Sequence, residues 1–217
     1  MALEWNLTGE ASRAMRAFYA ALPRVPRGSW PELLHGMGYN FEFYDGLFVL
    51  MLANVQLSFD AGDYTPRHRA MQQALIPFCS EFGIELGHGV QRTHRDLYAE
   101  FFQIATGRPM PERYPTDDTS PWLAAARRAA DEMRLAIQGP RAGSGVKRAR
   151  FSLGYFWAVE HLSVEEFDLM RAAWRGLGVD AAYLDAHCAV EGDHDAHSTE
   201  AVLAFTDARD PIAGEAV

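Results

Sequence analysis

The chain has 217 residues, of which 48 % are hydrophobic and 23 % charged, a composition typical of a folded globular domain and unlike that of a disordered chain. Its formal net charge of −9 argues against a broad binding surface for nucleic acid or anionic lipid. The two cysteines are too few for a disulfide scaffold and fit a reduced compartment, so we expect a cytoplasmic protein. Because of the negative net charge, we expect no nucleic-acid partner.

A membrane location is not expected either. The longest strongly apolar run spans residues 46–53, whereas a helix needs about 20 apolar residues to cross a bilayer. The N-terminus, Met-Ala-Leu-Glu-Trp, lacks the basic segment followed by an apolar segment that marks a signal peptide. The sequence therefore predicts no membrane partner.

The first half of the chain predicts three helices. The first spans about residues 8–22 and ends at a turn that contains two prolines. The second begins near residue 30, carries apolar residues at intervals of three and four, and stops near residue 60. The third spans about residues 65–105, and Pro77 together with the glycines at 83, 87 and 89 is expected to bend it.

The second half predicts a loop and then four more helices. The loop covers residues 107–115, and the third of these helices opens with Ser163-Val-Glu-Glu166, a capping box. No stretch shows the clean two-residue alternation of a strand. The predicted fold class is all-α, with residues 1–217 forming a single domain, a seven-helix bundle whose tail frays from about residue 207. The four helices are expected at about 121–139, 146–161, 163–178 and 180–206.

The last predicted helix carries three potential metal ligands on one face. His187, Glu191 and His194 follow one another at intervals of four and three residues. With about 100° per residue in an α-helix, they project within a wedge of roughly 60°. A solvated acidic face is the alternative, because three aspartates stand close by on the same helix.

The third predicted helix repeats that spacing with Glu81, Glu85 and His88, and Glu160 follows an apolar stretch on the fifth. Several carboxylates inside an apolar bundle are costly and repel one another unless they are paired, hydrogen-bonded or bound to metal. Because mixed imidazole and carboxylate ligands suit non-haem iron or manganese, the sequence predicts a metal site built by three helices. The other histidines near this pattern are expected to be structural or to support a ligand: His94, His161 and His197.

The order and combination of these motifs resemble the haem-oxygenase-like di-iron oxidases and oxygenases. The resemblance covers about residues 30–205 and implies the haem-oxygenase-like fold. In that family the position of Glu191 is more often Asp. The metal ligands that the resemblance implies are His187, Glu191, His194, Glu160 and His88, together with Glu81, Glu85 or both.

The resemblance also implies a function. It predicts an O₂-dependent oxidase or oxygenase that holds Fe(II), expected as two ions, and uses O₂ as a co-substrate. An external electron donor or a sacrificial oxidation would then restore Fe(II). The implied substrate is a small metabolite, such as an amino acid or amine, in natural-product biosynthesis. The sequence leaves a homodimer open.

Two features bear on the substrate. Aromatic residues of the second and fifth predicted helices are expected mainly in the core, with part of them lining a cavity for an aromatic or apolar molecule. Arg92 and Arg95 lie one to two turns beyond His88 and could hold a carboxylate in a bidentate manner. Together they favour an amino-acid-like substrate.

Two other functions remain open. The same fold hosts metal-free, thiaminase-type hydrolases with a cysteine nucleophile, and Cys79 and Cys188 are available for that role. A non-catalytic helical binding protein, including a haem carrier, is the other alternative, although the first predicted helix contains no histidine. Full activity after chelation would favour the hydrolase, and a Soret band would favour the haem carrier.

Overall fold

The computed structural model describes residues 9–60, 64–85, 89–114 and 120–205, so the predicted frayed tail lies outside the described residues. The described part forms seven α-helices, four short 3-10 helices and one antiparallel two-stranded hairpin, which confirms the predicted all-α fold class. The α-helices are α1 (Glu10–Ala21), α2 (Trp30–Gln56), α3 (Tyr64–Glu81), α4 (His94–Thr106), α5 (Pro121–Gln138), α6 (Gly145–Gly176) and α7 (Ala182–Phe205). The strands are β1 (Ile84–Glu85) and β2 (Gly89–Val90), and the 3-10 helices are Leu22–Arg24, Arg27–Ser29, Leu57–Asp60 and Pro140–Ala142.

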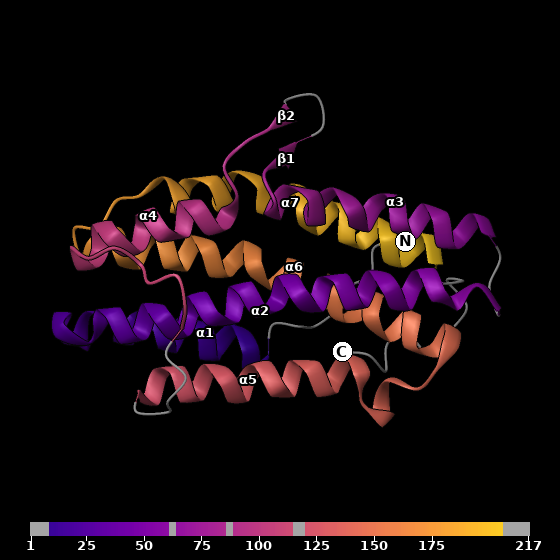
Figure 1. Cartoon of the computed structure of the whole chain (residues 1–217), viewed down its shortest axis with the longest axis horizontal. Coiled ribbons are helices and arrows are strands. Elements are labelled where there is room, and N and C mark those ends of the chain that lie inside the picture. Colours follow the sequence, from indigo (N-terminus) through magenta and orange to yellow (C-terminus); the bar gives the residue numbers. More distant parts are fainter. Residues whose placement is uncertain (1–8, 61–63, 86–88, 115–119, 206–217) are drawn as a thin grey trace.

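The long helices lie side by side along the longest axis of the molecule (Figure 1). α2 and α6 pack against each other in the middle, and α5 covers α2 on one side. On the other side α7 packs against α6, α3 and α4. The β1–β2 hairpin connects α3 to α4 and projects away from the bundle.

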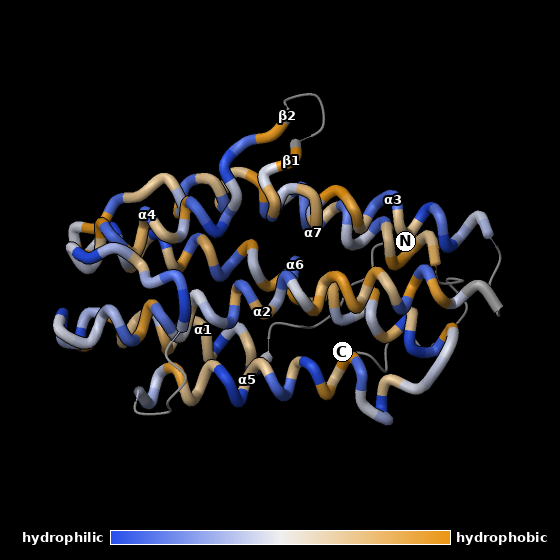
Figure 2. The backbone as a smooth tube through the Cα atoms, viewed as in Figure 1, coloured by the Kyte–Doolittle hydropathy of each residue, from blue (hydrophilic) through white to orange (hydrophobic). Residues whose placement is uncertain are grey.

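Two apolar clusters fill the bundle at different levels along its axis. One contains the edge-to-face pair Trp30 and Trp174, whose ring centroids are 5.1 Å apart. The other contains Phe48 and Phe156, at 4.5 Å, and Figure 2 shows how apolar residues dominate the second half of α2 that builds it. Between these clusters lies the middle of α6 and α7, where polar residues are buried. No helix in the described ranges combines the length and hydropathy that a bilayer crossing requires.

The third predicted helix, expected to bend over residues 65–105, is instead interrupted and forms two helices with a hairpin between them. α3 ends at Glu81, and Gly83 then adopts φ +68°, where a Cβ would stand 2.5 Å from the carbonyl oxygen of Gln91. Only glycine fits this left-handed, tightly packed position, so the chain turns into the hairpin there. α4 begins afresh after Thr93, which forms a capping box with Asp96.

The fifth and sixth predicted helices are one helix, α6. The Ser163 hydroxyl donates to the carbonyl of Val159 at 2.9 Å and therefore caps nothing. Glu165 and Glu166 point toward α1, where Glu165 accepts from Ser12 at 2.5 Å and Glu166 accepts from Tyr19 at 3.0 Å. The capping-box prediction was wrong because both partners of the motif have other bonds and nothing in this stretch breaks the helix.

α2 and α5 approach each other closely at a glycine. A Cβ on Gly36 would lie 2.9 Å from the backbone carbonyl oxygen of Trp122, whereas a Cβ on Gly46, in the same helix, would meet nothing within 4 Å. We expect Gly36→Ala to lower the free energy of unfolding by about 1–3 kcal/mol, because the backbone must move apart. The control Gly46→Ala should raise it by about 0.5–1 kcal/mol through helix propensity. Urea denaturation measures both. A Gly36→Ala protein as stable as the wild type would contradict the close packing of α2 against α5.

Candidate metal centre

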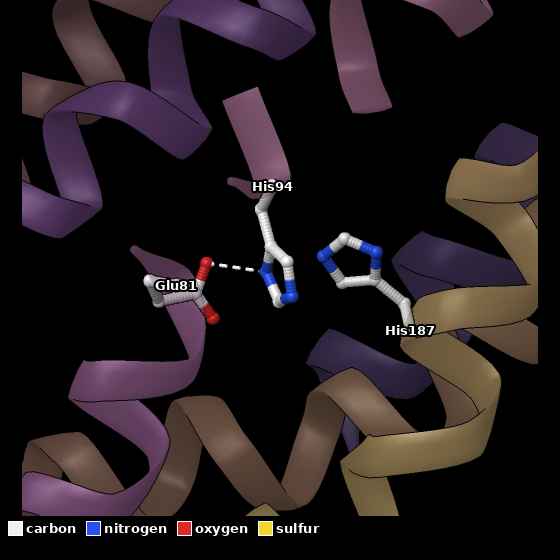
Figure 3. Close-up of side chains that lie close together, drawn as sticks. All are labelled: Glu81, His94 and His187. Atoms are coloured by element: carbon white, nitrogen blue, oxygen red, sulfur yellow. Dashed lines mark hydrogen bonds and ion pairs between the residues drawn. The ribbon is translucent and has the colours of Figure 1, made fainter. Parts of the chain in front are cut away.

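Three candidate ligands meet where α3, α4 and α7 come together. One ligand atom from each of Glu81, His94 and His187 lies within 4.8 Å of the others. His94 stands between the other two, with its Nδ1 2.6 Å from Glu81 Oε2 and its ring centroid 4.2 Å from that of His187 (Figure 3). We call these residues the first group.

The interrupted helix explains how the first group forms. Glu81 is the last residue of α3 and His94 is the first residue of α4. Gln91 N donates to Gly83 O at 2.6 Å, and this bond closes the hairpin, so the start of α4 lies next to the end of α3. The capping box at Thr93 then fixes the start of α4, which aims His94 toward Glu81.

A second group of candidate ligands lies deeper in the bundle. Glu160 on α6 and Glu191 and His194 on α7 again place one ligand atom each within 4.8 Å of the others. Their exposed fractions are only 5 %, 4 % and 3 %, so bulk water does not solvate their charges. Tyr44 on α2 donates a hydrogen bond to Glu160 Oε1 at 3.2 Å and so holds that carboxylate in place.

The electrostatics of a metal-free interior are unfavourable. Burial, together with the nearby carboxylates of Glu160 and Glu81, raises the pKa of Glu191 to about 10. Burial also lowers the pKa of His187 to about 3, with the His94 ring acting in the same direction. Burial opposes ionisation of Glu81 too, but the hydrogen bond and charge of His94 outweigh it and lower the pKa of that carboxyl.

The residues fit a divalent cation. His194 Nδ1 is buried, has no hydrogen-bond partner among the described residues, and faces Glu160 Oε2 at 3.5 Å and Glu191 Oε2 at 3.9 Å. An orphaned imidazole nitrogen between two carboxylates is the environment that a bound metal would satisfy. His187 Nδ1 lies 3.0 Å from the carbonyl oxygen of Tyr183, which can only accept, so Nδ1 carries the hydrogen and Nε2 keeps its lone pair.

The structure brings together five of the seven predicted site residues and adds one. Glu85 lies on β1, beyond the end of α3, so the expected common helix face of Glu81 and Glu85 was wrong. His88 lies outside the described residues. His94, expected to be structural or supporting, joins the first group instead. The five are Glu81, Glu160, His187, Glu191 and His194.

A cavity of about 620 Å³ opens next to both groups, and residues from each of α1 to α7 line it. Of the aromatic residues that the sequence offered for a cavity, Phe41 and Tyr44 line it, whereas Phe48 and Phe156 pack in the core. Arg95 lines it as well but is ion-paired with Glu42. Arg92 is paired with Glu100 at 2.6 Å and is absent from the cavity wall.

Comparison with known protein families identifies the relationship. The family described as iron-containing redox enzyme matches residues 49–217, more than half of the chain. The chain belongs to this family. Neither curated proteins nor solved structures give a significant match. The matched range of this iron-containing redox enzyme family includes both groups of candidate ligands, and it confirms the predicted resemblance to haem-oxygenase-like iron enzymes.

We expect His187→Ala and His194→Ala each to lower the iron bound per chain by about tenfold or more, because each removes an imidazole ligand from a buried site. His197→Ala is the matched control. It lies on the same helix and is bonded to Gln73 Oε1 at 2.7 Å, away from both groups, so its iron content should stay at the wild-type level. Metal analysis measures the iron, and far-UV circular dichroism checks that α7 is intact. Unchanged iron in the first two variants would remove them from the site.

Proposed function

We propose that this iron-containing redox enzyme is an O₂-dependent, non-haem di-iron oxidase or oxygenase that acts on a small metabolite. The observation that carries the proposal is the pair of ligand groups, one buried and one partly buried, each with carboxylate and imidazole donors, at the wall of one cavity. Five of the six candidate ligands line that cavity: Glu81, His94, Glu160, His187 and Glu191.

The side chains around the site have distinct tasks in this proposal. Two iron ions would supply the activation of O₂. Tyr44 orients Glu160 by its hydrogen bond, and Tyr183 fixes the His187 ring from the backbone. Phe167 stacks on His187 with ring centroids 4.0 Å apart and excludes water from that side. The result is a set of oriented ligands beside a space for substrate.

The substrate would enter the cavity and not bind at the surface. Its wall is mostly apolar, with Leu33, Met37, Trp122 and Met133 among its residues. Such a wall favours a small molecule with an apolar body and keeps bulk water away from the reacting bond. An amine or amino acid in natural-product biosynthesis is the substrate class we favour. An external electron donor and a cytoplasmic location belong to the same proposal.

The thiol-dependent alternative has less support. Neither Cys79 nor Cys188 lines the cavity. Burial raises the pKa of the Cys188 thiol, and the nearby Asp168 adds to this, which makes a poor nucleophile. The thiaminase-type hydrolase therefore has no nucleophile at the cavity that would bind its substrate.

Rapid mixing tests the O₂ chemistry. Anaerobic protein loaded with Fe(II) and a candidate amine, then mixed with O₂, should develop a transient visible absorption band. The Glu191→Ala variant should show no such band, because it removes a carboxylate from the second group. Glu165→Gln, a change on the outer face of α6, should behave like the wild type. Absence of the band with every amine and amino acid tried would count against di-iron chemistry.

Metal removal separates the two enzyme classes. Chelation should abolish O₂ consumption, and added Fe(II) should restore it, because in this proposal the bound iron supplies the activation of O₂. Treatment with iodoacetamide should leave O₂ consumption within about twofold of the untreated rate, since neither thiol lines the cavity. Full activity after chelation, together with loss after alkylation, would replace our proposal by the hydrolase.

A further inference from the structure

The charged residues of the cavity wall are mostly acidic. Arg95 is the arginine that the described cavity wall contains, and the other nitrogen bases there are the imidazoles of His94 and His187. Bound metal would neutralise the carboxylates that serve as its ligands, so only the carboxyl groups outside the ligand groups could attract a cationic ligand. The acidic residues of the wall are Glu42, Asp45, Glu81, Glu160, Glu166 and Glu191.

Most of these carboxyl groups already have a partner or belong to the metal centre. Glu42 is ion-paired with Arg95 and accepts a hydrogen bond from Tyr114 at 2.9 Å. Asp45 stands close enough to Glu81 and His94 for their charges to act on it, so it is a neighbour of the first group. Glu166 is the remaining carboxyl group of the described cavity wall, and although its charge acts on Glu191, it belongs to neither ligand group.

Glu166 has one hydrogen-bond partner among the described residues. Tyr19 on α1 donates to its Oε1 at 3.0 Å, and its Oε2 has no partner there. The neighbouring Glu165 shows what α1 can supply to a carboxylate, because it is bonded to Ser12 and ion-paired with Arg16 on the outer surface. α1 therefore gives a cation to the outer glutamate and only a hydroxyl to the one that lines the cavity.

An enclosed carboxylate without a cation is costly. Burial raises the pKa of Glu166, and the hydrogen bond from Tyr19 only partly opposes this. A cation within the cavity would stabilise the ionised form, and the free Oε2 could accept a hydrogen bond from it. The wall beside it, including Phe18 and Phe167, is apolar and suits the carbon body of a ligand.

We propose that Glu166, oriented by Tyr19, binds the ammonium group of the substrate, which is an amine with an apolar body. This deepens the proposed function and rests on it for the statement that the bound amine is the substrate. It replaces the expected role of Arg95 as a carboxylate clamp. Arg95 is held by Glu42 and also donates to Met110 Sδ at 3.1 Å, so its guanidinium is occupied.

Three eight-carbon probes test the subsite: n-octylammonium, n-octanol and n-octanoate. Calorimetry on the anaerobic protein as isolated, with its iron content determined, should rank n-octylammonium as the tightest and n-octanoate as the weakest. Glu166→Gln keeps the shape and removes the charge. It should weaken n-octylammonium by about tenfold or more, as expected for a charge-assisted hydrogen bond, and change n-octanol less than twofold. Glu165→Gln, the matched outward neighbour, should bind all three like the wild type.

Three results would overturn the proposal. The first is n-octanol binding to the wild type as tightly as n-octylammonium. The second is an equal loss of both ligands in Glu166→Gln, which would indicate a structural role. The third is an unchanged n-octylammonium affinity in that variant, as expected if the amine coordinates the metal. Because these measurements involve no O₂, a Glu166-dependent amine affinity without any O₂ reaction would refute the proposed function and leave the subsite standing.

Discussion

Three carboxylates and three imidazoles share the interior of one helical bundle, and the rest of the structure depends on how their charges are balanced. Side chains alone balance them only in part: His94 pairs with Glu81, whereas Glu191 has its pKa raised to about 10 and His194 Nδ1 has no partner within the described part of the chain. Buried polar groups that are protonated or lack part of their hydrogen bonds destabilise a protein core. Membership in an iron-containing redox enzyme family offers a physical reason for them, because a divalent cation bound at each group would stabilise its carboxylates and imidazoles.

How far this centre could be predicted follows from which residues share one regular element. The α7 ligands were predictable, because the pitch of a single helix fixes their common direction. Glu160 was recognisable because the residues that precede it on the same helix are largely apolar, which indicates a buried helix. His94 was not recognisable, because its place beside Glu81 depends on a hairpin that closes a break in the helical pattern. The Thr93-Asp96 capping box was the available local signal for a new helix there.

α6 is continuous across residue 163, where a new helix was predicted to begin, and this continuity matters for the site. Ser163 and Glu166 match a helix start by local sequence, but Ser163 bonds back to Val159 within α6, Glu166 accepts from Tyr19 of α1, and the helix continues. Apolar packing at both levels of the bundle holds the same helix through Trp157 and Phe167. As a result, Glu160 of the second ligand group and Glu166 of the proposed subsite belong to one rigid rod.

That rigidity constrains the reaction. Glu160 and Glu166 are six residues apart on α6, which corresponds to about 9 Å along the helix axis at about 1.5 Å per residue. An ammonium group held at Glu166 would therefore lie away from Glu160 along α6, whereas Glu191 of the second ligand group is close enough for the charge of Glu166 to help raise its pKa. The apolar wall beside Glu166 would then direct the carbon body of the amine, and this direction would decide which carbon lies next to the ligand groups.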